Sequence, residues 1–304
     1  MVRKFPARAR AWCAPLVLAA LAAGCAAGPP AAPRAPAPAA ARPVDKSLPK
    51  SDAATLAALD RLLAGPHRSD ANRARDVYRH PRETLEFFGL RADMTVMEIW
   101  PGPAGWYTEL LAPLLEDHGR YIAAGWDPKS DNKFVQDGIR SFQAKLDGDP
   151  GLYGKVEVVA LQYPGALAPV PPNSVDMIVT FRNLHNWLAR GEAAPSMLKA
   201  MYAALKPGGV LGLVDHRADP DAPVDHEAKT GYVNQQYAID VVRSVGFELV
   251  ATSEINANPR DTRDYEQGVW TLPPTWRLGD RDRERYAAIG ESDRFTLKFR
   301  KPPR

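Results

Sequence analysis

The stretch that decides the fold is Val96-Met97-Glu98-Ile99-Trp100-Pro101-Gly102-Pro103-Ala104-Gly105-Trp106. It opens on an apolar run that predicts a buried strand over residues 95–99, and a helix is predicted over about 104–117. Glycines between the two elements allow the backbone to approach a ligand closely. The helix N-terminus beyond them presents unpaired N–H groups to a negative group. The stretch therefore predicts a strand, a ligand-binding loop and a helix in succession.

The same alternation continues along the chain. Strands are predicted at 95–99, 121–125, 156–161, 176–181, 210–214, 247–251 and 295–299, mostly with helical patterns between them. This order predicts an α/β fold whose mostly parallel sheet carries helices on both faces. Ligands of such sheets bind beyond the carboxyl ends of the strands, so we expect the functional residues to follow strands one to five.

One domain is predicted over residues 51–304, which are enough for a single large core. Helical segments precede the first strand; Ser51 is expected to cap the first of them, and residues 71–79 to form the second. An insert over 256–293 separates the last two strands. A loop of that length is usually functional or disordered, and its tryptophans, Trp270 and Trp276, favour order.

The first 50 residues differ in composition from the domain. Residues 1–24 combine a basic start with a short apolar run, as in a secretory signal peptide, and a disordered Ala-rich tail is the alternative. The end of this segment resembles a bacterial lipobox, although Ala22 stands where Leu is usual, and Cys25 would be the lipidated residue. Residues 25–50 continue as an Ala- and Pro-rich linker.

This interpretation predicts an exported protein of the cell envelope or periplasm, held on a membrane surface by lipid at Cys25. Ala26, in place of Asp, implies the outer membrane by the same resemblance. The only other cysteine, Cys13, lies inside the predicted signal peptide. The domain therefore has no disulfide, no cysteine zinc site and no cysteine nucleophile.

The charge distribution argues against nucleic acid as a partner. The formal net charge of the whole chain is +3, and four basic residues lie in the predicted signal peptide, which leaves the remainder near −1. No basic patch is evident. No His-x-x-x-His or clustered carboxylate spacing predicts a metal site either. The oligomeric state is not indicated by the sequence.

Several segments resemble class I S-adenosylmethionine-dependent methyltransferases. The opening stretch resembles the family's first motif, Glu/Asp-x-Gly-x-Gly-x-Gly, and Lys206-Pro207-Gly208-Gly209 resembles its turn before strand five. Residues 174–178 and 181–187 resemble its fourth strand and the motif after it; 181–187 and 290–294 are also similar to an uncharacterised group of predicted methyltransferases. The resemblance covers about 85–255 and 295–300. It implies a Rossmann-like, seven-stranded, mostly parallel sheet with a reversed last strand.

The resemblance also implies how S-adenosylmethionine would bind. Glu98 would orient the loop and approach the amino group of the cofactor, and Gly102 would lie against its methionine part. Asp127 would accept hydrogen bonds from the ribose hydroxyls. The alternative role for Asp127 is that of a helix cap or turn residue ahead of Pro128.

The cofactor loop departs from the family pattern. Trp100 and Ala104 replace two motif glycines, although Gly105 follows one residue later. Trp100 either stacks on the adenine or fills the core. Gln162 occupies a place, after the third strand, where the family often has an acid. We predict Trp100, Gly105 and Gln162 as further cofactor-binding residues.

Candidate catalytic residues follow the fourth and fifth strands. A general base helps methyl transfer when the acceptor carries a proton, and histidine suits that role near neutral pH. His216 is the first candidate, and His185 and Asp215 are further candidates. The alternatives are a capping role for His185 and a structural ion pair between Asp215 and Arg217.

Candidate substrate-binding residues surround these positions. Arg182, Asn183 and Asn186 follow the fourth strand, Tyr232 precedes the helix before strand six, and Trp270 lies in the insert. Core packing is the alternative for the aromatic residues.

The sequence thus predicts an exported S-adenosylmethionine-dependent methyltransferase that acts on an unknown small molecule. The alternative is a non-catalytic small-molecule-binding envelope protein on the same fold, because the cofactor is made in the cytosol. A weaker alternative is another reaction that uses His185 or His216 on this fold.

The anchor can be tested by labelling cells with a radioactive fatty acid. We expect label on the wild-type protein and none on Cys25→Ser, because the thiol is the acylated group. Label that persists in Cys25→Ser would refute lipidation at this residue.

Overall fold

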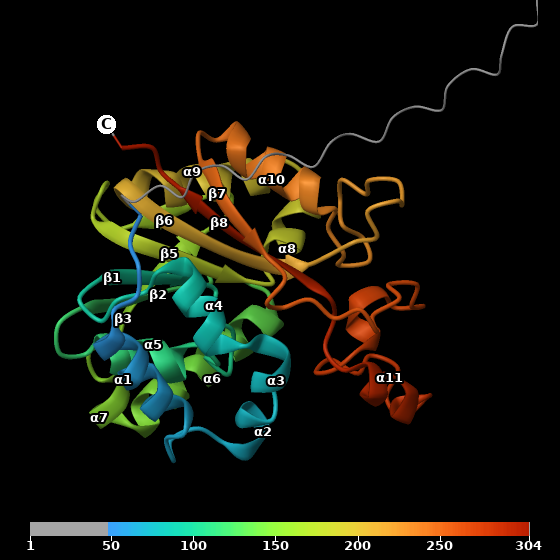
Figure 1. The fold of residues 1–304 in the computed structure, drawn as a ribbon, viewed down its shortest axis with the longest axis horizontal. Coiled ribbons are helices and arrows are strands. Elements are labelled where there is room, and N and C mark those ends of the chain that lie inside the picture. The colour runs from blue at the N-terminus through green and yellow to red at the C-terminus, as the bar shows by residue number, and fades with distance from the viewer. Residues whose placement is uncertain (1–47, 304) are drawn as a thin grey trace, which may run out of the picture. The chain divides into compact units, whose positions relative to one another are not determined.

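The computed structural model describes residues 48–303. The predicted signal peptide, lipidation at Cys25 and most of the linker lie outside the described residues. The described chain builds an eight-stranded sheet in the order β4-β3-β2-β1-β5-β6-β8-β7 (Figure 1). The strands are β1 (Thr95–Ile99), β2 (Arg120–Gly125), β3 (Glu157–Gln162), β4 (Ala166–Ala168), β5 (Val175–Phe181), β6 (Leu205–His216), β7 (Glu248–Ser253) and β8 (Arg294–Arg300).

The prediction of seven strands was one short. β4 adds to the edge of β3 in antiparallel register, with Leu161 opposite Leu167. Its three residues are too few to produce a readable alternation, so the sequence pattern gave no signal for it. The reversed last strand is present, because β8 runs antiparallel to both β6 and β7. The pairs β1–β2, β1–β5, β2–β3 and β5–β6 are parallel.

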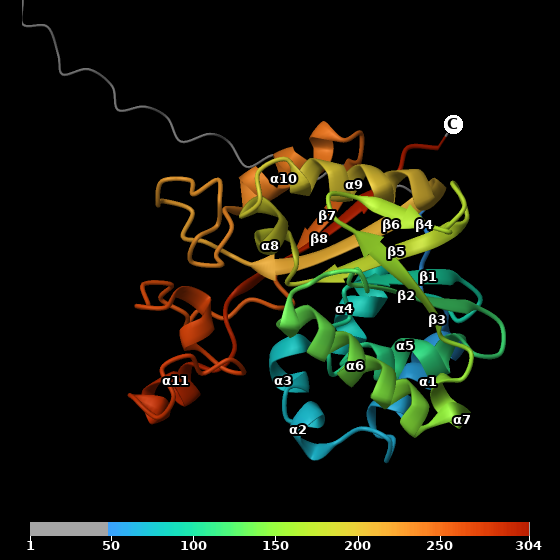
Figure 2. The same ribbon diagram turned by 180° about the vertical axis from the view of Figure 1, so that it is seen from behind.

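Helices cover both faces of the sheet (Figures 1 and 2). One face carries α1, α4, α5, α6 and α7, and the other carries α8, α9 and α10. The helices are α1 (Ala53–Leu63), α2 (Asp70–Arg73), α3 (Asp76–Arg79), α4 (Pro81–Phe88), α5 (Thr108–Leu115), α6 (Lys133–Gly148), α7 (Pro150–Tyr153), α8 (Leu184–Leu188), α9 (Ala193–Ala204), α10 (Gln235–Ser244), the 3₁₀ helix η1 (Gly268–Thr271) and α11 (Arg283–Ile289).

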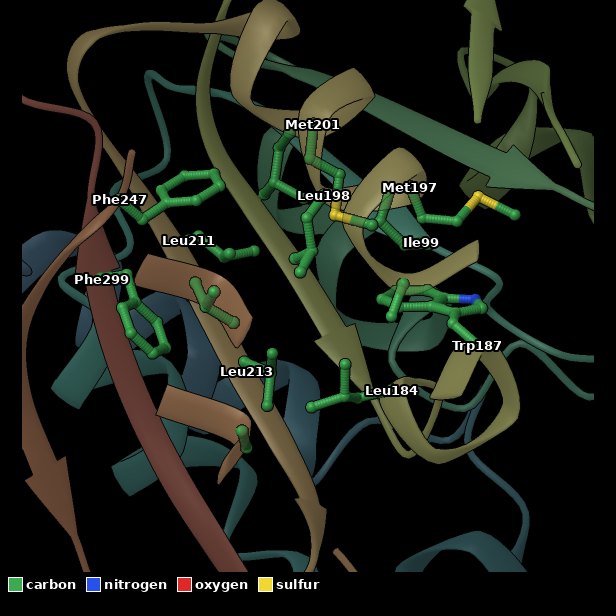
Figure 3. Packing of buried hydrophobic residues seen from close by; sticks show 14 of the residues in the cluster. Ile99, Leu184, Trp187, Met197, Leu198, Met201, Leu211, Leu213, Phe247 and Phe299 are labelled. Atoms are coloured by element: carbon green, nitrogen blue, oxygen red, sulfur yellow. The ribbon is translucent and has the colours of Figure 1, made fainter. Parts of the chain in front are cut away.

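An apolar core lies between the sheet and the helices α8, α9 and α10. Met197 and Met201 of α9 pack with Trp187 of α8 over sheet residues such as Leu211 (Figure 3). All four side chains are fully buried. Full burial of an apolar side chain stabilises a fold by about 1.5–3 kcal/mol, so this layer contributes strongly to holding α8 and α9 on the sheet.

Local chemistry sets the ends of the leading helices. Asp52, rather than the predicted Ser51, caps α1: its Oδ1 accepts from the N–H of Thr55 at 2.7 Å. A carboxylate at this position satisfies an N–H that the helix leaves free. In place of the single helix predicted over 71–79 there are two short helices, α2 and α3, which Ala74 and Arg75 separate.

The predicted turn before strand five lies inside the long strand β6. Gly208 has a φ of 80°, which glycine adopts without strain, and the pairing of β5 with β6 shifts register between Val175 and Met177. The turn residues thus form an irregular start of the strand.

The insert over 256–293 is ordered and contains η1 and α11. Its aromatic residues form a small apolar cluster with Tyr232, which precedes α10; the cluster comprises Tyr232, Tyr265, Val269, Leu272 and Tyr286. The insert lies beside α2 and α3 at one end of the sheet (Figures 1 and 2). Across residues 48–303, no helix is both long and apolar enough to cross a membrane.

Lys298 of β8 provides a test of this core. It is only 7% exposed, and within residues 48–303 its side chain makes no ion pair or hydrogen bond; burial lowers its pKa to about 8. Because the unfolded chain binds this proton up to about pH 10.4, the charge opposes folding below pH 8, and this penalty fades as pH rises from 8 to above 10. We expect Lys298→Met to raise the free energy of unfolding at pH 7 by up to about 3 kcal/mol, and by much less near pH 10.5.

Urea unfolding at several pH values would measure this gain. Lys133→Met, at a highly exposed position, is the control and should change little at any pH. A loss of stability in Lys298→Met at pH 7 would contradict the assignment of an unfavourable buried charge.

Candidate active site

Asp215 organises the carboxyl ends of β5 and β6. Its carboxylate is fully buried, and its Oδ1 lies 2.9 Å from Nδ1 of His185. The backbone N–H groups of His185 and His216 also donate to this carboxylate, at 3.0 Å and 2.8 Å. Because a carboxylate only accepts, the Nδ1 of His185 donates in this contact, which leaves Nε2 as the ring atom that can accept a proton. The predicted alternative, an ion pair between Asp215 and Arg217, is not formed: Arg217 pairs with Asp293 and Glu254.

His216 lies next to this pair. Its ring centroid is 5.2 Å from that of His185, and its Nδ1 lies 2.5 Å from the hydroxyl of Ser292. Burial and the neighbouring cationic side chains, Arg182 among them, hold the pKa of His216 well below its usual range. The ring is therefore neutral at physiological pH and is a weak proton acceptor.

Two of the predicted substrate-binding aromatic residues flank the histidines. The Trp270 ring, from the insert, lies 6.2 Å from that of His185, and Tyr232 lies 6.3 Å from His216. The hydroxyl of Tyr232 donates to both carboxylate oxygens of Asp261 at 3.0 Å. Tyr232 thus has the structural role that was the alternative for it, because its hydroxyl is bound to Asp261 and its ring belongs to the apolar cluster. The Trp270 ring lies beside the histidine pair.

The three residues predicted to follow the fourth strand have different environments. Asn183 is buried and its amide donates to the carbonyl of Ile99 at 2.8 Å, so it fastens the end of β5 to the end of β1. Asn186 is exposed on α8. Arg182 directly follows β5 with a φ of 61°, and its N–H donates to the carbonyl of Val214.

The loop after β1 adopts the conformation that its glycines allow. Trp100 has a φ of 48°, in the left-handed region that non-glycine residues avoid. Gly102 has a φ of 75°, and a Cβ there would meet no atom within 4 Å. Gly105, at 53°, is closely packed against Phe142 and Thr108. The open space therefore lies at Gly102.

Trp100 packs edge-on against two other indoles. Its ring centroid is 5.7 Å from that of Trp187 and 6.4 Å from that of Trp126. The Nε1 of Trp100 is buried and has no hydrogen-bond partner among the described residues. Filling core is thus one role the structure gives this side chain, and stacking on an adenine stays a prediction.

A cavity of about 170 Å³ lies between this loop and α6. Trp100, Pro101 and Gly102 form one wall, and the opposite wall comes from α6. The remaining lining residues belong to the ends of β2 and to β3: Gly125, Trp126, Pro128, Val158, Val159 and Ala160. The lining side chains carry no charge, which suits an apolar or aromatic group.

Solved structures share the fold of this chain. A "SAM dependent methyltransferase from Aquifex aeolicus" aligns with a TM-score of 0.50 and 16% identity over 81% of this chain and 98% of that one. The "[4+2]-Cyclase SpnF" aligns with a TM-score of 0.52 and 18% identity over 84% of this chain and 98% of that one. No protein-family model and no curated protein matches the sequence. The chain has the Rossmann-like methyltransferase fold.

The methyltransferase fold does not by itself fix the reaction, since one of these two structures is named as a cyclase. The reaction that such a fold carries depends on the side chains at the carboxyl ends of the strands. At this edge of the sheet, the uncharged cavity can bind a ligand, and the buried histidine–aspartate pair can take part in proton transfer.

Glu98 lies inside the protein. Its carboxylate accepts from the Tyr121 hydroxyl at 2.5 Å and contacts Thr108, and burial raises its pKa to about 7. It does not line the cavity. Contact with the amino group of a cofactor stays a prediction for this residue.

The other two predicted cofactor residues lie near the cavity without lining it. Asp127 forms a turn, in which its Oδ1 accepts from the N–H of Lys129 at 2.9 Å. The turn alternative is thus observed, and ribose binding stays a prediction. Gln162 ends β3 and is opposite Ala166 of β4.

The sequence placed two histidines and an aspartate after neighbouring strands, but their spacing did not indicate a set of metal ligands. His185, Asp215 and His216 offer ligand atoms within 4.8 Å of one another. A divalent cation would have to break the His185–Asp215 hydrogen bond and lie near Arg182, whose charge disfavours it. We therefore keep the absence of a metal as an expectation.

Five residues at or beside the site were not predicted individually from the sequence. Ser292 contacts His216, and a buried carboxylate, Glu291, lies beside it in sequence. Three arginines contact Glu291: Arg75, Arg79 and Arg294. The polar run Glu291-Ser292-Asp293-Arg294 just before the last strand was the available signal, because four polar residues there are unusual for a segment entering a buried strand.

Glu98 supplies a test of the buried network below the loop. Its pKa is raised from 4.5 to about 7, so its stabilising contribution is full below pH 4.5 and is lost as pH rises through 7. We expect Glu98→Gln to be more stable than the wild type at pH 8.5, by up to about 3 kcal/mol, and to match it near pH 4.5.

Thermal unfolding of both proteins across this pH range would measure the difference. Glu83→Gln, at an exposed position, should show no such pH dependence. A gain that is equal at both pH values would contradict the raised pKa as its cause.

Proposed function

We propose that the protein transfers a methyl group from S-adenosylmethionine to a small-molecule acceptor. The observation that carries the proposal is the pairing of two features at one edge of the sheet. The glycine loop and its uncharged cavity lie at the ends of β1, β2 and β3, and the His185–Asp215 pair lies at the ends of β5 and β6. A cofactor in the first region would face an acceptor in the second.

The residues of the cavity fit the cofactor. Gly102 leaves open space beside the loop, and the uncharged walls suit the adenosine moiety. The buried Nε1 of Trp100 is a hydrogen-bond donor that lacks an acceptor within the described chain, which a bound ligand would satisfy. One of the two structures of the same fold is named as an S-adenosylmethionine-dependent methyltransferase, which supports this choice of cofactor.

The bound cofactor supplies an electrophilic methyl group, and the protein contributes positioning and proton removal. Asp215 holds the His185 ring in one orientation, with Nε2 free to accept a proton from the acceptor. His216, the first candidate from the sequence, is held neutral with a lowered pKa and contacts Ser292. We therefore assign the general base to His185 and a supporting role to His216.

We also propose the cellular setting that the N-terminal sequence predicts. Signal peptide 1–24 and lipidated Cys25 would place the enzyme at the cell envelope, probed by the fatty-acid labelling described above. An envelope site needs a supply of cofactor outside the cytosol. If the cofactor binds and no acceptor is methylated, the non-catalytic binding protein on this fold becomes the better description.

Calorimetric titration with S-adenosylmethionine and its demethylated product tests the cofactor site. We expect both to bind, and Gly102→Ala to weaken binding at least about tenfold because a methyl group enters the open space. Gly279→Ala is a matched control, since Gly279 also has a positive φ and free space but lies in the insert. If neither molecule binds, the proposal is wrong.

Transfer of a labelled methyl group to a set of small acceptors tests the base. We expect Asp215→Asn to lower the rate by about 10²–10⁴-fold at unchanged cofactor affinity, because His185 loses its orienting partner. Asp264→Asn, at an exposed position in the insert, is the control. Equal rates in Asp215→Asn and the wild type would remove His185 from the mechanism.

A further inference from the structure

Four arginines surround one buried carboxylate beside the histidine pair. Glu291 is 2% exposed and contacts three guanidinium groups, from Arg75 at 2.6 Å, Arg294 at 2.5 Å and Arg79 at 3.3 Å. Arg182 is the fourth, close enough to all of these groups to interact electrostatically with them. The group therefore holds a surplus of positive charge.

Arg182 has no partner of its own. Its side chain is half-buried and, within residues 48–303, forms no ion pair and no hydrogen bond. Arg75 contributes a second unsatisfied donor, since its Nη2 is buried without an acceptor among the described residues. Native proteins seldom leave guanidinium donors unused in this way.

The surplus charge is unfavourable in the folded protein. Burial and the neighbouring Arg79 lower the pKa of Arg182 to about 9, and the same arginines help to hold the pKa of Glu291 low. Arg182 also has a backbone φ of 61°, a conformation that costs about 1 kcal/mol for a residue with a side chain. Neither feature stabilises the fold, so a functional reason is required.

The position of Arg182 connects it to the acceptor region. It follows β5 directly, and its N–H is bonded to Val214 near the end of the adjacent strand β6. Arg182, Arg79 and Arg294 all act on the pKa of His216, which places their charges next to the histidine pair. The arginine group thus lies beside the histidine pair, in the region proposed for the acceptor.

We propose that the acceptor carries an anionic group, a carboxylate or a phosphate, that binds Arg182 and the free donor of Arg75. The proposal rests on the proposed function for the meaning of acceptor, and the anion site itself stands on the arginines alone. A guanidinium presents donors in a planar fork that matches both kinds of anion. The anion would neutralise the surplus charge and fix the orientation of the acceptor relative to His185.

Thermal unfolding without S-adenosylmethionine tests the anion site separately from methyl transfer. Inorganic phosphate and succinate, at constant ionic strength, are the two probes, and they distinguish a phosphate from a carboxylate ligand. We expect at least one to raise the Tm of the wild type saturably, by about 5 °C at concentrations far above its Kd.

Arg182→Gln separates a ligand-binding arginine from a structural one. Because it removes a half-buried, unpaired charge that lies among other arginines, we expect it to raise the Tm in the absence of added anions and to abolish most of the anion-dependent rise. Arg140→Gln, at an exposed position on α6, should change neither value. Arg182→Lys, which keeps the charge and loses the fork, should retain part of the response.

Three results would overturn the proposal. The first is a wild-type Tm that responds to neither probe. The second is an equal anion response in Arg182→Gln and Arg140→Gln. The third is a lower Tm of Arg182→Gln without anions, since that would show a structural partner for the charge. Binding of S-adenosylmethionine in the same samples, measured by calorimetry, reports independently on the proposed function.

Discussion

The site depends on one buried carboxylate, that of Asp215. It lies at the end of β6, and its oxygens accept three hydrogen bonds, from the backbone and ring of His185 and the backbone of His216. An ionised carboxylate without partners would be very costly at a fully buried position, so these donors must be present for β6 to end as it does. The orientation of α8 and of both histidines follows from this requirement.

Charge balance divides the carboxyl edge of the sheet into two unlike regions. The cavity by Trp100 and Gly102 has uncharged walls, whereas the region around Glu291 has more guanidinium groups than carboxylates. The histidine pair lies next to the charged region. A cofactor with an aromatic base and an anionic second substrate would each find a different environment on the same edge.

The sequence was sufficient to predict the sheet and the loop because local patterns encode them. The glycines after β1 and the alternation of apolar runs are visible in short windows, and β1 to β8, apart from β4, lie where these patterns fall. β4 has three residues and no period to detect. The split of the second helix at Arg75 was missed for the same reason, since two turns with a break resemble one longer helix in composition.

The candidate site was only partly predictable. His185, Asp215 and His216 followed from their place after two strands, but the hydrogen bond that orients His185 required the actual path of α8. Ser292 and Glu291 reach the site from the other end of the chain, and no local pattern states which distant side chain they will meet. Pairings of that range are decided by the packed fold.

The contact between Arg75 and Glu291 also sets an order of events. The two residues are 216 positions apart, so their contact closes a loop that contains nearly the whole sheet. Ser292 and Arg294 enter with the last strand, β8, which inserts between β6 and β7. A chain that emerges with its N-terminus first therefore completes the candidate site only when β8 has joined the sheet, and deletion of β8 would remove the site and the pairing of β6 with β8 together.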